Sequence, residues 1–71
     1  MIEIMRSNNF VELSLAQSLL TEAGIVHFLA DQNMSIMEGS LGVLPRRLMV
    51  ERARAEEARK ILRDADINDV V

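Results

Sequence analysis

The 71-residue chain contains no cysteine, no tryptophan and no tyrosine, and its only phenylalanines are Phe10 and Phe28. Without cysteine it forms neither disulfides nor the thiolate zinc sites on which many small domains depend. The single histidine, His27, excludes a two-histidine metal site within one chain. No segment has the ~18 consecutive apolar residues of a membrane-spanning helix, and the N-terminus does not resemble a signal peptide. These absences predict a cytoplasmic protein that has no cofactor and does not enter a membrane.

Aliphatic residues dominate what remains. Hydrophobic residues make up 49% of the chain, which is too many for a disordered segment, and the formal net charge is −3. The length predicts a single domain over residues 1–71. A single small core stabilises the folded state by only about 3–5 kcal/mol. We therefore expect oligomerisation to contribute to stability.

Local patterns predict three strands and two helices. Apolar and polar residues alternate over 1–6, while strand-forming residues dominate 25–30 and 46–51. A helix with apolar residues at helical spacing follows Asn9, a good N-cap, and ends before Gly24. The spacing predicts a second helix over about 53–65. The tail 66–71 is either a short edge strand or a frayed end.

This order of elements determines the expected fold. A right-handed β-α-β crossover makes the first two strands parallel, and the third strand then fits between them in the antiparallel direction. Both helices cover one face of a three- or four-stranded sheet. The sequence therefore predicts an α+β fold, a ferredoxin-like β-α-β-β-α(-β) sandwich.

The other face of this sheet has no helix to cover it. Alternation along the strands places Val26 and Phe28 toward the helices and an apolar set on the uncovered side. Large exposed apolar patches mark contacts, and methionine suits adaptable surfaces. There are two alternatives. Either the assignment of side chains to the two faces is shifted by one residue, or the C-terminal tail covers this side of the sheet. The candidate interface residues are Met5, Ile25, His27, Leu29 and Met49.

The connection 31–45 is long for a small domain and rich in apolar residues, so we expect it to contact a ligand or partner. Its segment Glu38–Gly42 contains two glycines. A phosphate-binding loop also requires a Lys-Ser/Thr pair or a third glycine at a helix start, and neither follows here. These glycines are therefore interpreted as turn residues.

Basic residues are concentrated in one part of the chain, because segment 46–63 contains seven of the eight. Such a segment could bind a phosphate or nucleic acid. The negative net charge and the lack of stacking aromatics on the predicted sheet surface argue against nucleic acid. The candidate anion contacts are Arg46, Arg47, Arg52 and Arg54.

Four segments together form a pattern of helix, turn glycine and strand hydrophobics. They are Glu12 to Leu20 followed by Ala23-Gly24-Ile25 and Asp31; Gly39 to Pro45; Leu48-Met49-Val50; and Glu57 to Leu62. Over nearly the whole chain this pattern resembles the small bacterial family of putative signal-transducing proteins, a domain of unknown function. The resemblance implies a ferredoxin-like α/β sandwich and a role in signalling, and it carries over no catalytic residues. Arg52 and Arg54 depart from the acidic residues common near this helix start in the family.

The leading hypothesis is a non-enzymatic regulatory or interaction module. It would form a homodimer, or bind a protein partner or small ligand, through the open sheet face and the 31–45 loop. The alternative is a phosphate- or nucleic-acid-binding module that uses the basic 46–63 segment. A third hypothesis, an enzyme with His27 at a subunit junction, lacks a carboxylate or nucleophile that the sequence places beside His27.

Overall fold

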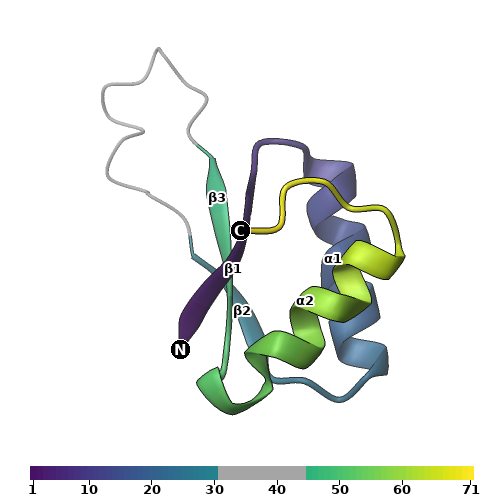
Figure 1. The fold of residues 1–71 in the computed structure, drawn as a ribbon. Helices are drawn as coiled ribbons and strands as arrows, with labels where there is room; N and C mark the ends of the chain where they lie inside the picture. Colours follow the sequence, from purple (N-terminus) through teal and green to yellow (C-terminus); the bar gives the residue numbers. More distant parts are fainter. Residues whose placement is uncertain (31–44) are drawn as a thin grey trace.

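The computed structural model describes residues 1–30 and 45–71, which form a sheet with two helices packed on it (Figure 1). The strands of the described part are β1 (Ile2–Ser7), β2 (His27–Ala30) and β3 (Arg46–Val50). The helices are α1 (Phe10–Glu22) and α2 (Ala55–Asp64), and a 3₁₀ turn at Arg52–Arg54 leads into α2. The predicted order of elements is confirmed.

The sheet has the strand order β1-β3-β2, and β3 is antiparallel to both of its neighbours. Strands β1 and β2 are therefore parallel to each other, as a right-handed crossover through α1 requires. Both helices lie on the same side of the sheet (Figure 1). The structure confirms an α+β fold of the ferredoxin-like type.

The C-terminal tail pairs with the free edge of β1 as a partial fourth strand. Val70 forms an antiparallel bridge with Met5. The Arg6 N–H donates to the Asp69 carbonyl oxygen at 3.2 Å, and the Val71 N–H donates to the Ile4 carbonyl oxygen at 2.9 Å. The tail is therefore not frayed, although it forms an isolated bridge at the edge of β1 rather than an assigned strand.

Helix α1 begins at Asn9, whose side-chain Oδ1 accepts the Glu12 N–H at 3.0 Å. Ser7, at the end of β1, connects the two residues. Its hydroxyl accepts the Asn9 N–H at 2.9 Å and donates to Glu12 Oε1 at 3.0 Å. This hydroxyl takes the place of the direct contact between the Glu12 side chain and the Asn9 backbone that a simple capping box would make.

Helix α1 ends in a left-handed turn at Gly24, whose φ of +73° is a conformation that favours glycine. The Ile25 N–H donates to the Leu20 carbonyl oxygen at 2.9 Å, and the Gly24 N–H donates to that of Thr21 at 3.0 Å. This is a Schellman motif, in which the residue after the glycine packs back on the helix. Both Ile25 and Leu20 are accordingly buried.

Helix α2 ends in the same way, with an aspartate in place of glycine. Asp66 has a φ of +64°, and the Ile67 N–H donates to the Leu62 carbonyl oxygen at 3.1 Å. Ile67 is buried against the core, so this turn directs the chain from α2 back to the sheet.

The core between the sheet and the helices is entirely aliphatic apart from one thioether. Strands β1 and β3 and both helices contribute residues to it. Ile25, which precedes β2, and Ile67, which follows α2, also belong to it. Its buried members are Ile4, Met5, Leu13, Ala16, Leu20, Ile25, Leu48, Val50, Ala55, Ala58, Leu62 and Ile67.

The prediction that Met5 faces outward is wrong, because β1 contains a β-bulge. Glu3 pairs with Met49, but Met5 pairs with Leu48, so the register shifts by one residue between them. Ile4 and Met5 are consecutive, yet both have 0% exposure. The bulge therefore turns Met5 into the core.

The predicted faces of β2 are wrong as well, and here the Schellman motif is the cause. The hydrogen bond from Ile25 to Leu20 fixes the Ile25 side chain inward, leaving it 2% exposed. Alternation then sends Val26 and Phe28 outward. His27 pairs with Val50, so it lies on the helix side of the sheet, and Leu29 pairs with Leu48 on the same side.

Candidate functional site

The side of the sheet that faces away from both helices is the candidate site. The register gives two of its rows across β1, β3 and β2, and continuing the alternation by one residue beyond each strand gives a third row. We call this surface the open face. Its rows are Met1, Glu51 and Val26; Glu3, Met49 and Phe28; and Arg6, Arg47 and Ala30.

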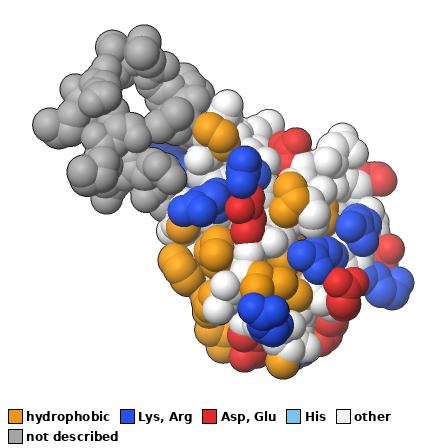
Figure 2. Space-filling model, turned by 60° about the vertical axis from the view of Figure 1, so that its left-hand side comes forward, with side chains coloured by type: hydrophobic (Ala, Val, Ile, Leu, Met, Phe, Trp, Pro, Cys, Tyr) orange, Lys and Arg blue, Asp and Glu red, His pale blue; other side chains and the backbone are white. Residues whose placement is uncertain are grey.

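An apolar band crosses the open face from β3 to β2. Phe28 lies directly opposite Met49 in the register, and 49% of its surface is exposed. Val26, just before β2, is 57% exposed. Figure 2, which brings the sheet side of the molecule forward, shows hydrophobic side chains gathered next to basic and acidic ones. An exposed aromatic ring beside a methionine is typical of the centre of a protein contact.

Charged residues border this band on β1. The guanidinium of Arg6 donates to both carboxylate oxygens of Glu3, from Nε at 2.8 Å and from an Nη at 3.0 Å. These hydrogen bonds lower the pKa of the Glu3 carboxyl below its usual value, and the positive charge of Arg47 acts in the same direction. Glu3, Arg6 and Arg47 therefore form one charged cluster on the open face.

The predicted interface set does not share this surface. Of its five residues, only Met49 lies on the open face. Met5 and Ile25 are buried in the core, and His27 and Leu29 lie on the helix side. The segment 31–45 lies, apart from Pro45, outside the described residues.

His27 lies in a shallow depression beside α1. Its Nδ1 is 2.9 Å from the Ile25 carbonyl oxygen. Because a carbonyl oxygen only accepts, this contact is a hydrogen bond when Nδ1 carries a proton. The rest of the depression consists mainly of polar α1 side chains. They are Ser14, Gln17, Ser18, Leu19, Thr21 and Glu22.

The four candidate anion contacts are separated in the structure. Arg46 lies over the Phe10 ring, with its Cζ 5.6 Å from the ring centroid, a cation–π contact at the start of α1. Arg47 lies on the open face, where its Nε is buried without a hydrogen-bond partner among the described residues. Arg52 is exposed in the 3₁₀ turn. These positions do not form one anion site.

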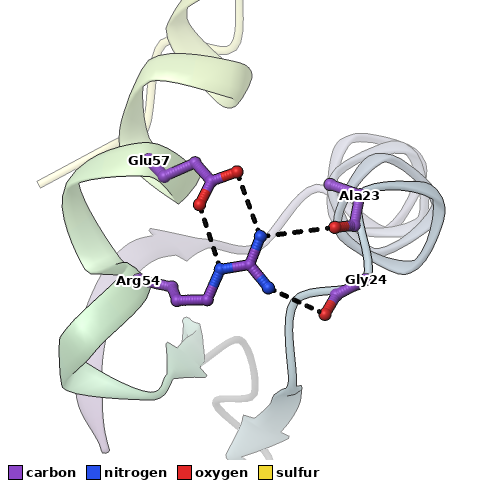
Figure 3. Close-up of polar contacts among 4 residues, drawn as sticks. All are labelled: Ala23, Gly24, Arg54 and Glu57. Atoms are coloured by element: carbon purple, nitrogen blue, oxygen red, sulfur yellow. Dashed lines mark hydrogen bonds and ion pairs between the residues drawn. The ribbon is translucent and has the colours of Figure 1, made fainter.

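Arg54, the fourth candidate, joins the end of α1 to the start of α2 (Figure 3). It donates to both carboxylate oxygens of Glu57 at 3.0 and 3.1 Å. It also donates to the Gly24 carbonyl oxygen at 3.1 Å and, more weakly, to that of Ala23 at 3.5 Å. A cation at these positions satisfies carbonyl groups that the end of α1 leaves without helical partners. Arg54 is thus engaged in holding the fold together.

Sequence reasoning missed Phe28, Val26 and Ala30 as members of the open face. A signal for them was present, because a residue directly after a helix-ending glycine commonly packs back on the helix. Assigning Ile25 inward on that ground, and alternating from it, would have placed Val26, Phe28 and Ala30 outward.

Two searches of the described residues bear on other kinds of site. Within 1–30 and 45–71, no group of three His, Asp or Glu residues is arranged to hold a metal ion. Nor does this part of the chain contain a helix with the length and apolar character needed to cross a membrane.

Comparison with known proteins identifies the family. No curated protein matches the chain. Residues 1–66 match the model of a family described as "Putative prokaryotic signal transducing protein". This match covers both helices and all three strands of the described part, along with the Schellman turn at Gly24. The chain belongs to this family.

Proposed function

We propose that this protein is a non-enzymatic regulatory module that acts by associating with a second copy of itself through the open face. The observation that carries the proposal is the half-exposed ring of Phe28 next to Met49 at the centre of that face. The chain has only two phenylalanines, and the core uses neither. A small domain that leaves its largest apolar side chains outside its core gains stability when they are buried in a contact.

A second copy is the occupant that suits the charges of this face. The open face carries Arg6 and Arg47 as well as Glu3 and Glu51. A strongly basic or acidic partner would meet like charges on part of it, whereas a surface of the same composition supplies both signs. Self-association also fits the small core, because a partner copy adds buried apolar area that one chain of this size lacks.

The contact is expected to be weak. A standard interface uses about 20–30 residues on each side, and the open face as defined has nine. We expect dissociation in the micromolar range or above, which suits a regulatory contact that forms and separates with concentration.

A binding role rather than catalysis is supported by the surroundings of His27. Its Nδ1 is bonded to a backbone carbonyl, and no carboxylate hydrogen bond to its ring is found among the described residues. A general acid or base is normally oriented by such a partner.

The proposal is tested by sedimentation velocity from micromolar to millimolar protein. We expect the wild-type sedimentation coefficient to rise with concentration, and Met49→Asp to remain monomeric because it places an unpaired carboxylate at the centre of the apolar band. The matched control is Val11→Asp, since Val11 is 77% exposed on α1. A wild-type chain that stays monomeric throughout, or a Met49→Asp variant that associates like the control, would contradict the proposal.

A further inference from the structure

The central strand of the open face carries opposite charges at its two ends. On β3 and the residue after it, the outward side chains are Arg47, Met49 and Glu51 in that order. Glu51 continues in extended backbone, with φ −65° and ψ 141°, so the alternation holds through it. At about 3.3 Å per residue, Arg47 and Glu51 are about 13 Å apart along the strand. The open face thus has a basic end and an acidic end.

The neighbouring strands do not cancel this polarity. Beside Arg47, the charges of Glu3 and Arg6 neutralise each other through their two hydrogen bonds. Beside Glu51, continuing the register by one residue beyond each strand brings Met1 to one side and Val26 to the other, and neither side chain carries a charge. Arg47 therefore supplies the charge of the basic end, and Glu51, which also interacts electrostatically with Arg54, is the acidic residue of the other end.

Two stacked copies can run their β3 strands in the same or in opposite directions. In the parallel arrangement Arg47 lies over Arg47 and Glu51 over Glu51, which brings like charges together at both ends. In the antiparallel arrangement each Arg47 lies over the Glu51 of the other copy, and Met49 lies over Met49. Packed sheets keep their strands within about 30° of alignment, so either arrangement keeps these rows in contact.

We infer that two copies stack open face to open face with antiparallel β3 strands, so that Arg47 of each pairs with Glu51 of the other. This inference rests on the proposed function and adds the orientation and the residues that select it. The arrangement has a two-fold axis, and the same surface patch is used twice, as in the commonest closed dimers. Charge complementarity of this kind sets orientation and excludes wrong pairings more than it raises affinity.

Charge exchange between the two ends tests the orientation. Arg47→Glu makes both ends acidic, so we expect it to weaken self-association at least about tenfold. The double variant Arg47→Glu/Glu51→Arg reverses the polarity, and antiparallel pairing then restores an Arg–Glu pair at each end. The control Arg63→Glu makes the same change of charge at an exposed position on α2. Circular dichroism verifies that each variant is folded.

A mixing experiment separates the antiparallel from the parallel arrangement. Fluorescently labelled wild-type protein is titrated with the double variant and followed by fluorescence anisotropy. Antiparallel pairing opposes Arg47 of the wild type to the arginine introduced at position 51, so we expect no mixed dimer. Mixed dimers tighter than the wild-type dimer would show parallel pairing and overturn the inference.

The outcomes also separate this inference from the proposed function. If Met49→Asp abolishes association but Arg47→Glu weakens it no more than Arg63→Glu, the orientation is wrong while the contact surface stands. If the wild-type chain never associates, both fail. Restoration of association by the double variant, together with no mixing with wild type, supports the antiparallel pair.

Discussion

Two adjacent residues just before β2 give the most direct test of which side of the strand faces the core. Ile25 is 2% exposed and Val26 is 57% exposed. Alternation assigned from the sequence alone places them the other way round. Shortening each side chain should therefore affect stability very differently, although the residues are neighbours and both are β-branched.

The expected magnitude follows from burial. Ile25→Val removes a buried methyl group that packs on Leu20, and such changes cost about 0.5–1.5 kcal/mol in free energy of unfolding. In a domain of this size, about 1 kcal/mol lowers the Tm by about 4–8 °C. Val26→Ala removes methyl groups that already contact solvent, so we expect a change within about 0.5 kcal/mol.

Urea denaturation followed by circular dichroism measures both variants against the wild type. Measurements at low micromolar concentration keep self-association from contributing, and equal m-values would show that the unfolded states are comparable. If Val26→Ala costs as much as Ile25→Val, the orientation of β2 described above is incorrect. The Schellman motif at Gly24 would then not determine which side of β2 faces the core.

Two further predictions concern the C-terminal part of the chain. Asp66 has a φ of +64°, a conformation that glycine adopts more readily than aspartate. Asp66→Gly should therefore raise the free energy of unfolding by about 0.5–1 kcal/mol. Thermal denaturation measures this change, and a Tm below that of the wild type would contradict the prediction. In the folded chain the carboxyl groups of Glu12 and Asp69 share a hydrogen bond that needs a proton on Glu12. This hydrogen bond raises the pKa of Glu12 above its usual 4.5. A raised acid pKa means that the folded state binds the proton more tightly, so this stabilisation is complete below about pH 4.5 and is lost as the pH rises through the folded-state value. Asp69→Asn should therefore stabilise the domain more at pH 7 than at pH 4 in urea denaturation, and an equal effect at both pH values would contradict the pairing.

Much of the fold could be predicted from local patterns. Asn9 and Gly24 bound α1 as expected, because each has a side chain or backbone freedom suited to its end of a helix. The antiparallel β3 between the parallel strands β1 and β2 is the arrangement typical of the β-α-β-β-α order of elements in a split β-α-β unit. These features depend on neighbouring residues or on the order of the elements along the chain.

The open face was harder to predict because strand alternation has a period of two. An error of one residue moves every side chain of a strand to the other side of the sheet. The bulge at Ile4 and Met5 has no glycine or other local marker in the sequence. The role of Arg54 was equally hidden, since it bonds to carbonyl oxygens 30 and 31 positions earlier in the chain.

The bulge in β1 has a consequence for how the length of this strand could vary. Before it Glu3 pairs with Met49, and after it Met5 pairs with Leu48, so the two halves of β1 differ in register by one residue. Deleting Ile4 would bring the halves into a single regular register and leave Glu3, Arg6 and Ser7 on their present sides. Deleting Met5 instead would have the same effect, because Ile4 would then pair with Leu48 and still point inward, whereas deleting Arg6 would turn the Ser7 hydroxyl away from α1. Positions 4 and 5 are thus the places in β1 where a relative could be one residue shorter and keep both the α1 cap and the open face.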